Sequence, residues 1–356
     1  MRFITISIFV SLLCINAFGA KATKGGNINI IYTNDVEGSV DTCGCAMDPG
    51  GGAVRRVNWY KMNALSPLDT VYINGGNTLF THTDYMDYEV KYLKVGAQIL
   101  ADSMSMMNID AYTPGEQDLK LGLDFFLSAS KKLPVLITNS GSDKFKKEII
   151  INKGGLKIGI IGILSEKLLS KELATVLDIK DAVASLKAEL PKLKKETDLV
   201  ILIVHTDDNE IKTILKNTRG VDVILSTGVN EELTRPMIAN NSIVVRTLPG
   251  GDSVGLLKYE HKNGAKKVDV GFNNSLIAKS GQLELIIKTI DDKKTISNLE
   301  KERSKLEDLL VKTDDSSSKF ENRIDFLGKM YAGKNGLDAR VKKYEALRKT
   351  SAPRFK

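Results

Sequence analysis

The side chains best suited to chemistry follow short apolar runs that are typical of buried strands. They are Asp35, Glu37, Asn77, Glu116, His205 and Asn230. Polar groups just beyond the carboxyl ends of strands are where α/β sheets build binding sites. Carboxylate and amide oxygens with a single imidazole form a donor set suited to Ca²⁺, Mg²⁺ or Mn²⁺. The pattern predicts a site for one such cation, although Asp and Asn at these places also serve to turn the chain.

A second group of reactive side chains lies after the first of these runs. Cys43-Gly44-Cys45 precedes three consecutive glycines and an expected helix that opens with Arg55 and Arg56. We expect the thiols to act as redox groups or as replacement metal ligands. We expect the arginines at the helix start to bind an anion. Two thiols without a role, or a local disulfide, remain the alternative.

The scarcity of cysteine and histidine excludes several kinds of site. The chain of 356 residues has three Cys and three His, and it contains no Cys-x-x-Cys pair. Covalent c-type haem, ordinary zinc ribbons and ferredoxin clusters are therefore excluded. A metal site rich in imidazole is excluded as well.

The elements that must position these residues alternate between strands and helices from about residue 27 to 279. Predicted strands cover 28–34, 70–74, 109–112, 134–138, 148–153, 156–164, 198–205, 221–226, 242–247 and 254–260. Predicted helices cover 52–65, 88–107, 120–133 and 179–195. Gly154-Gly155 predicts a tight hairpin between two strands. This alternation indicates an α/β fold with mixed sheets.

The C-terminal region has a different composition. Residues 282–356 are rich in Lys, Glu, Asp and Leu, and the spacing of their leucines predicts a helical hairpin or short coiled coil. Ser316-Ser317-Ser318 is interpreted as the turn between two helices. Residues 329–356 hold nine basic and two acidic residues, which account for the whole net charge of +7. This distribution favours a solvated basic end or contact with an acidic partner, and no nucleic acid is expected.

The first twenty residues predict export. Met1-Arg2 precedes an apolar run from Ile4 to Ile15, and Ala17-Phe18-Gly19 offers small residues for cleavage. These features are typical of a secretory signal peptide, too short for a spanning helix. We therefore expect a mature chain in the periplasm or outside the cell.

The order of the polar motifs resembles the N-terminal domain of secreted 5′-nucleotidase-type metallophosphoesterases, in the calcineurin-like superfamily. That family carries Asp-x-His, Gly-Asp, Gly-Asn-His-Glu, a lone His after a buried strand and Gly-His-x-His, in the order of the sites found here over about residues 27–279. The resemblance implies a four-layer α/β/β/α sandwich, with 282–356 as a helical C-terminal extension. It also implies a two-metal hydrolysis of phosphoesters.

Carried over residue by residue, the family's metal centre is incomplete in this sequence. Asp35 and His205 match, whereas Glu37 stands for a His and Asn77 for the Asp that bridges the two metals. Glu116 and Gln117 stand for the Asn-His pair, so the catalytic His position holds glutamine. Gly228 and Asn230 replace both histidines of the last motif. Some secreted relatives carry a Cys-Gly-Cys, which implies that the thiols could replace lost ligands.

Three functional hypotheses follow from the resemblance. The first is a relative with a degraded centre, weak or absent hydrolysis and at most one divalent cation or a cysteine-based site. The second is an active phosphoesterase with a divergent centre, acting on a phosphorylated small molecule. The third is a binding or scaffold protein that docks a partner protein through residues 282–356. That segment is too short and too helical to match the family's nucleoside-binding domain, so nucleotide specificity is not implied.

Overall fold

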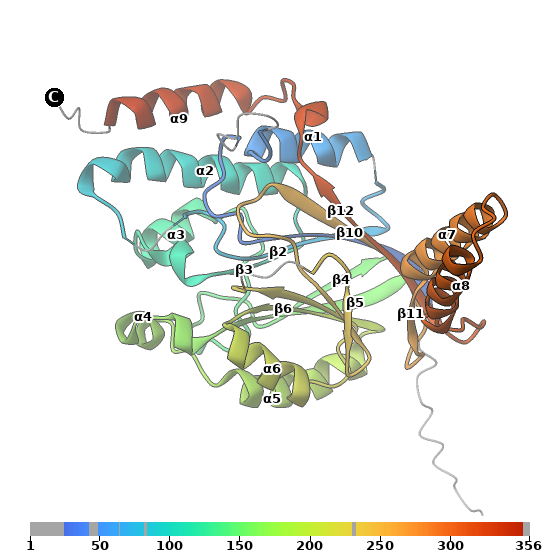
Figure 1. Ribbon diagram of the computed structural model, residues 1–356. Coiled ribbons are helices and arrows are strands. Elements are labelled where there is room, and N and C mark those ends of the chain that lie inside the picture. The colour runs from blue at the N-terminus through green and yellow to red at the C-terminus, as the bar shows by residue number, and fades with distance from the viewer. Residues whose placement is uncertain (1–24, 43–48, 64, 82–83, 230–232, 352–356) are drawn as a thin grey trace, which may run out of the picture.

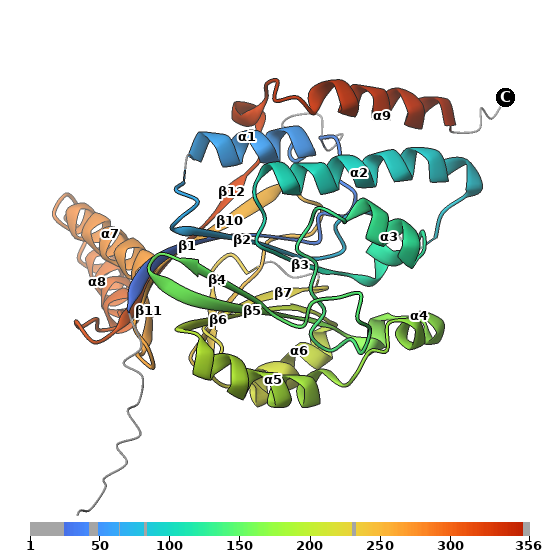
Figure 2. The ribbon, with the colours of Figure 1, turned by 180° about the vertical axis from the view of Figure 1, so that it is seen from behind.

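The protein is described by a computed structural model, which places residues 25–42, 49–63, 65–81, 84–229 and 233–351. Two β-sheets lie face to face, and helices cover the outer face of each (Figure 1). The same four layers are visible from behind (Figure 2). The predicted α/β/β/α sandwich is confirmed.

The first sheet has the strand order β11-β12-β10-β1-β2-β3. Its strands are β1 (Gly26–Asn34), β2 (Thr70–Gly76), β3 (Ala111–Pro114), β10 (Ser253–His261), β11 (Lys267–Asp269) and β12 (Ser318–Phe326). Strands β1, β2 and β3 run parallel, so their carboxyl ends share one edge of the sheet. Strand β10 is antiparallel to β1. The residues after the three parallel strands are therefore brought together.

The second sheet has the order β4-β5-β6-β7-β9-β8. Its strands are β4 (Ile149–Lys153), β5 (Leu156–Leu164), β6 (Leu199–His205), β7 (Val223–Thr227), β8 (Met237–Ala239) and β9 (Ser242–Val245). Every residue of β6 is buried because its apolar side chains fill the layers on both faces. The β4–β5 hairpin turns at Gly154 and Gly155, both with positive φ, as predicted.

Helices cover the sheets from outside. On the first sheet's side lie α1 (Ala53–Asn63), α2 (Val90–Met106) and α3 (Leu123–Ala129), with α9 (Asp338–Ser351) outside them. On the second sheet's side lie α4 (Lys171–Val176), α5 (Ala182–Glu196) and α6 (Asp208–Asn217). Helices α7 (Val270–Ile287) and α8 (Lys293–Asp308) form a hairpin that projects from one end of the molecule (Figure 1). In the described residues, no helix is long and apolar enough to cross a membrane.

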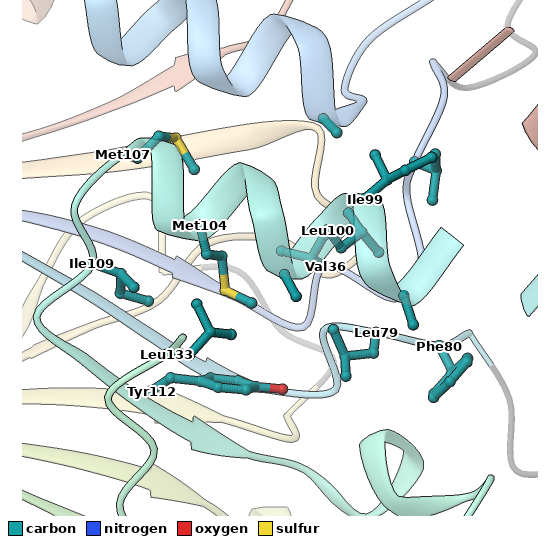
Figure 3. Close-up of a cluster of buried hydrophobic side chains, with 14 of the residues drawn as sticks. Val36, Leu79, Phe80, Ile99, Leu100, Met104, Met107, Ile109, Tyr112 and Leu133 are labelled. Carbon is teal, nitrogen blue, oxygen red and sulfur yellow. The ribbon is translucent and has the colours of Figure 1, made fainter. Parts of the chain in front are cut away.

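Three apolar clusters hold the layers together. One lies between the sheets and includes Ile30, Ile73 and Ile201, each fully buried. A second joins the first sheet to its helices, and Figure 3 shows Leu100 and Met104 of α2 packing toward Tyr112 of β3. The third joins the second sheet to α5 and α6. The sheets are thus anchored on both faces, which fixes the positions of their carboxyl edges.

The C-terminal region departs from the sequence-based prediction. Strand β12 was not predicted, and it pairs with β10 over eight residue pairs inside the first sheet. Ser316–Ser318 leads into this strand, so its interpretation as a turn between two helices is wrong. The boundary predicted at 279–282 falls inside α7. Helix α9 packs on α2, where Arg340 Nη1 lies 2.7 Å from Asp102 Oδ2.

One strand predicted in the body did not form. Residues 134–138 make only isolated bridges, from Val135 to Tyr112 and from Leu136 to Lys146. Thr138 instead donates its hydroxyl to the carbonyl of Lys147, and its amide bonds the carbonyl of Gly162. The segment is apolar because Leu136 and Ile137 fill two cores rather than because it joins a ladder.

Candidate functional site

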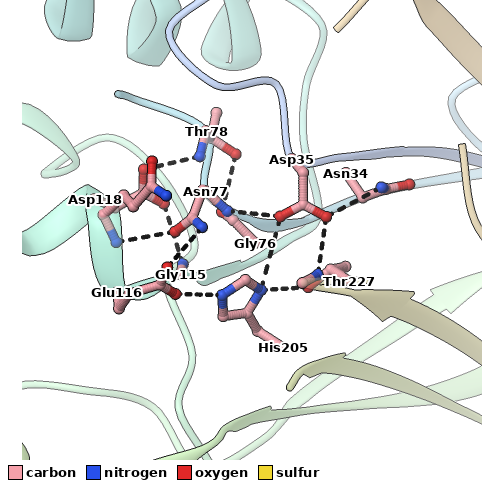
Figure 4. Close-up of polar contacts among 12 residues, drawn as sticks. Asn34, Asp35, Gly76, Asn77, Thr78, Gly115, Glu116, Asp118, His205 and Thr227 are labelled. Carbon is pink, nitrogen blue, oxygen red and sulfur yellow. Dashed lines mark hydrogen bonds and ion pairs between the residues drawn. The ribbon is translucent and has the colours of Figure 1, made fainter. Parts of the chain in front are cut away.

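The predicted polar residues meet in a small cavity at the carboxyl edges of the two sheets (Figure 4). The cavity has a volume of about 180 Å³. It is lined by Asp35, Glu37, Asn77, Glu116, Gln117, Leu168, His205, Gly228, Val229 and Pro249. Five of the six residues chosen from strand ends therefore share one pocket, and the sixth, Asn230, lies outside the described residues.

Asp35 is buried and accepts hydrogen bonds from backbone amides. Its Oδ1 accepts from the amide of Asn77 at 3.0 Å, and its Oδ2 accepts from the amide of Gly228 at 2.9 Å. The Asn34 side chain adds a third donor at 3.2 Å. Asp35 itself has a φ of 43°, a conformation that Asp tolerates better than most residues. Its carboxylate therefore ties three chain segments together.

His205 and Glu116 form an ion pair across the cavity. His205 Nε2 lies 2.6 Å from Glu116 Oε2, and Nδ1 lies 2.8 Å from the hydroxyl of Thr227. Although burial opposes protonation, the hydrogen bond to Glu116 and the charge of Asp35 raise the pKa of His205. Burial likewise opposes ionisation of Glu116, but His205 lowers the pKa of that carboxyl. The ring is thus placed so that its protonated form can donate to both Glu116 and Thr227.

Asn77 connects this pair to the next loop. Its Nδ2 donates to Glu116 Oε1 at 3.0 Å, and its Oδ1 accepts from the amide of Gln117 at 2.9 Å. A Cβ at Gly115 would lie 2.0 Å from Asn77 Oδ1, so the contact requires glycine at that position. Among the described residues, Gln117 Oε1 is buried without a hydrogen-bond partner.

Asp118 was not selected from the sequence, yet it holds the site together. It is fully buried, and its Oδ1 accepts from the amides of Thr78 and Leu79 at 2.8 and 2.6 Å. Its Oδ2 accepts from the hydroxyl of Tyr112 and the amide of Gly115. Burial raises the pKa of Asp118 to about 7, against the effect of these hydrogen bonds. Its place three residues after Gly115, typical of a cap, was the available signal.

Glu37 gives the cavity an excess of negative charge. Burial and the charges of Asp35 and Glu116 raise the pKa of Glu37. The three carboxylates face the single imidazole of His205. Mutual repulsion of this kind disfavours an anion in the cavity and favours a cation.

Other residues selected from the sequence lie elsewhere. Arg55 and Arg56 are buried, and they donate to backbone carbonyls of Leu327 at 3.2 Å and Gly251 at 3.0 Å. The guanidiniums therefore join α1 to the loops beside it, and the anion site stays a prediction. Cys43 and Cys45 lie outside the described residues.

The described side chains do not fit a pair of metal ions. Within the described ranges, no group of three or more His, Cys, Asp or Glu side chains is arranged to hold a metal. Both nitrogens of His205 and both oxygens of Asp35 are engaged inside the protein. Gly228, where the family pattern has a histidine, has a φ of 78°. A Cβ there would lie 2.6 Å from the carbonyl oxygen of Thr206.

No family model matches the chain, but it is similar in sequence to curated proteins. It is 25% identical over 258 residues to an apyrase of Aedes albopictus, covering 62% of this chain and 44% of the relative. It is 26% identical over 270 residues to a 5′-nucleotidase of Diplobatis ommata, covering 68% and 44%. The chain therefore spans less than half the length of these curated relatives.

Solved structures share its fold. A 5′-nucleotidase precursor from Thermus thermophilus matches with a TM-score of 0.61 and 16% identity, over 91% of this chain and 59% of that one. The calcineurin-like phosphoesterase YfkN from Bacillus subtilis matches with a TM-score of 0.57 and 16% identity, over 92% and 98%. At these identities the likeness concerns the fold, and it agrees with the α/β/β/α layers described above.

Proposed function

Because the chain is a relative of the 5′-nucleotidase-type metallophosphoesterases, we propose that it is an exported member with a degraded dinuclear centre and weak or absent phosphoester hydrolysis. The observation that carries this proposal is the contact between His205 Nε2 and Glu116 Oε2 at 2.6 Å. A metal-binding imidazole needs a free nitrogen lone pair, and this nitrogen is paired with a carboxylate instead. The retained histidine is thereby withdrawn from metal binding.

The replaced residues support the same proposal. A two-metal centre needs ligands that offset the repulsion between its cations, and a neutral amide such as Asn77 supplies no charge for that task. Gln117 has no proton to exchange near neutral pH, so general acid–base help of about 10²–10⁴-fold is absent from this position. At Gly228, where the last motif of the family has a histidine, the structure leaves no room for a side chain.

A single divalent cation is the part of the proposal that the charges favour. Glu37 faces the cavity with Asp35 and Glu116, and the three carboxylates exceed the one imidazole in charge. Mg²⁺ and Ca²⁺ prefer such oxygen ligands. Glu37 would be its main ligand, because Asp35 is committed to backbone amides.

Two measurements on the purified mature chain test the proposal. Hydrolysis of AMP and p-nitrophenyl phosphate is measured with Mg²⁺, Mn²⁺, Ca²⁺ or Zn²⁺, beside Asp35→Asn and His205→Gln variants. We expect the wild type to turn over no faster than either variant. Elemental analysis should find at most one divalent ion per chain, reduced in Glu37→Gln. Rapid turnover that both Asp35→Asn and His205→Gln abolish would overturn the proposal.

One observation keeps the divergent-centre hypothesis as a second candidate. The described segments before and after residues 43–48 meet each other, since the Ala53 amide donates to the carbonyl of Val40. Gly51 also lies against Asp252, near the loop that borders the cavity. Under this hypothesis a Cys43→Ser/Cys45→Ser variant loses both bound transition metal and turnover. Unchanged metal content in that variant would remove the cysteines from consideration.

The hypothesis of a docking tail needs a different test from simple truncation. Removing residues after Lys279 would delete β12 and so damage the first sheet. The α7–α8 hairpin instead offers exposed Ile277 and Leu285, which are 56% and 65% accessible. If an Ile277→Ser/Leu285→Ser variant keeps the wild-type oligomeric state and partners, the docking role of the hairpin should be dropped.

A further inference from the structure

The cavity lined by Asp35, Glu37 and Glu116 is called here the carboxylate pocket. A second, apolar cavity of about 450 Å³ adjoins it. It is lined by Thr234, Leu248, Pro249, Asp252, Ser253, Ile324 and Phe326, and is called here the Leu248–Phe326 cavity. Its volume falls within the range of about 300–1,000 Å³ that is usual for small-molecule sites. The carboxylate pocket alone, at about 180 Å³, holds little more than a small polar group.

The two largest apolar side chains of this cavity remain half exposed. Leu248 and Phe326 are each 47% accessible to solvent. The ring of Phe326 rests against Gly50, where a Cβ would lie 2.4 Å from Cζ. Glycine at position 50 therefore leaves room for the ring beside the backbone. An aromatic face held in this way is suited to stacking with a ring of a bound molecule.

The two cavities meet at a single anchored loop. Pro249 lines both of them. On one side of it, the Thr247 amide donates to Asn34 Oδ1 at 2.7 Å. On the other, the Gly250 amide donates to the carbonyl of Asp35 at 2.7 Å. Pro249 is thus held at the end of β1, and the two cavities lie on either side of this one residue.

The carboxylate pocket determines the charge of such a ligand. Its carboxylates are Asp35, Glu37 and Glu116, and its cation is His205. The unpartnered Oε1 of Gln117 adds a buried acceptor among the described residues. Acceptors and negative charge together select a group that donates hydrogen bonds and carries positive charge.

We propose that the two cavities form one binding site for an organic cation, with a ring-sized apolar group in the Leu248–Phe326 cavity and an ammonium group in the carboxylate pocket. The site goes beyond the proposed function, since it requires neither a metal nor hydrolysis. It also accounts for a pocket that keeps its acidic residues after the imidazoles of a metal centre have been replaced.

Calorimetric titration of the mature chain in a metal chelator at pH 7 tests this proposal. The probes are 2-phenylethylamine, ethylamine without the ring, 2-phenylethanol without the charge and phenyl phosphate with the opposite charge. We expect 2-phenylethylamine to bind at least tenfold more tightly than each of the other three. Equal affinity for all probes, or no binding of the amine, would overturn the proposal.

Variants then assign the two parts of the ligand to the two cavities. Leu248→Ala and Glu37→Gln should each weaken binding of 2-phenylethylamine at least fivefold. Only Glu37→Gln should reduce the preference over 2-phenylethanol. Leu285→Ala on α7, an exposed leucine away from either cavity, is the matched control and should bind as the wild type does. If Leu248→Ala and Glu37→Gln also bind as the wild type does, the amine occupies another place and the proposal fails.

These results are independent of the hydrolysis assay. Binding is measured without metal, whereas turnover is measured with it. Turnover of phosphoesters together with tight amine binding would refute only the proposed function. No turnover and no amine binding would refute only the cation site.

Discussion

Two buried histidines occupy opposite edges of the sheets, and their surroundings shift their pKa values in opposite directions. His205 ends β6 at the carboxyl edge, and His261 ends β10 beside the beginning of β1. Both are at most 1% exposed. The pKa of His205 is raised, whereas burial lowers the pKa of His261 and outweighs the neighbouring carboxylate of Asp222. The same residue type, buried in both regions, is therefore easier to protonate in one region and harder to protonate in the other.

The difference lies in how each carboxylate is compensated. Asp222 Oδ1 is 3.8 Å from His261 Nδ1 but 3.1 Å from Lys267 Nζ, so the lysine supplies its counter-charge. Glu116 pairs with His205 itself at 2.6 Å. A buried imidazole takes up a proton where it is the nearest cation to a carboxylate, and burial by itself does not decide the outcome.

The largest expected difference is in the stability lost when each histidine is replaced by glutamine. His205→Gln should destabilise the fold by about 3 kcal/mol, because it leaves the partly buried charge of Glu116 without its partner. His261→Gln should cost about 1 kcal/mol, since Asp222 keeps Lys267. Urea unfolding of both variants measures the two losses. Equal losses would show that the ion pair at Glu116 adds nothing beyond packing.

The glycines beside the two histidines give the next largest contrast. Gly228 and Gly264 both have positive φ, of 78° and 68°. A Cβ at Gly228 would lie 2.6 Å from the Thr206 carbonyl oxygen, whereas no atom lies within 4 Å at Gly264. Gly228→Ala should cost about 2 kcal/mol and Gly264→Ala about 1 kcal/mol. The difference in urea midpoint between Gly228→Ala and Gly264→Ala reports the crowding around His205. Equal midpoints would argue that the loop at Gly228 relaxes to accept the methyl group.

The pH dependence of stability should show the two histidines acting in opposite directions. The raised pKa of His205 gives stability that is complete below the unfolded pKa of 6.5 and lost as the pH rises through the folded value. The lowered pKa of His261 costs stability as the pH falls below 6.5, because the unfolded state binds the proton first. Each slope is at most about 1.4 kcal/mol per pH unit.

Melting temperatures between pH 5 and pH 9 check this expectation. The fall in melting temperature toward pH 9 should be smaller in His205→Gln than in the wild type. The fall toward pH 5 should be smaller in His261→Gln. If His205→Gln shows the same fall in melting temperature toward pH 9 as the wild type, the imidazole is not the titrating group.

The smallest expected effect concerns one hydroxyl at each histidine. Thr227 Oγ1 lies 2.8 Å from His205 Nδ1, and the Tyr259 hydroxyl lies 3.2 Å from His261 Nδ1. Thr227→Val should cost about 1 kcal/mol, since a charged donor loses its acceptor, and Tyr259→Phe about 0.5 kcal/mol. Thermal unfolding at pH 6 compares the two. A larger loss for Tyr259→Phe would reverse the assignment of charge.

Much of the body of the fold was predictable because its strands are long apolar runs. Residues 156–164 and 198–205 were predicted as strands within one residue of their observed bounds. Strand β12 was missed because Ser-Lys-Phe-Glu-Asn-Arg-Ile-Asp-Phe is largely polar. Its alternation buries Ser318 and Phe320 on one face, which only the neighbouring strand β10 makes favourable.

The site was predictable as a set of residues and not as a set of contacts. Parallel strands place their carboxyl ends at one edge, so the grouping of Asp35, Asn77, Glu116 and His205 followed from their positions after strands. The contacts of Arg55 and Arg56 could not be predicted from a helix start near glycines, and anion binding by these residues stays a prediction. Burial of both side chains against backbone carbonyls depends on loops around residues 251 and 327, far away in the sequence.

The sequence by itself determined which residues would stand at the edge of the sheets, because local apolar runs set where each strand ends. Tertiary structure decided which of them became partners. Glu116 follows β3 of the first sheet and His205 ends β6 of the second, and their 2.6 Å contact exists only because the two sheets pack with these edges together. Charge states follow the same rule, since the pKa of a buried group depends on distances to groups elsewhere in the chain. His205 and His261 cannot be told apart in this respect from their own neighbours in the sequence.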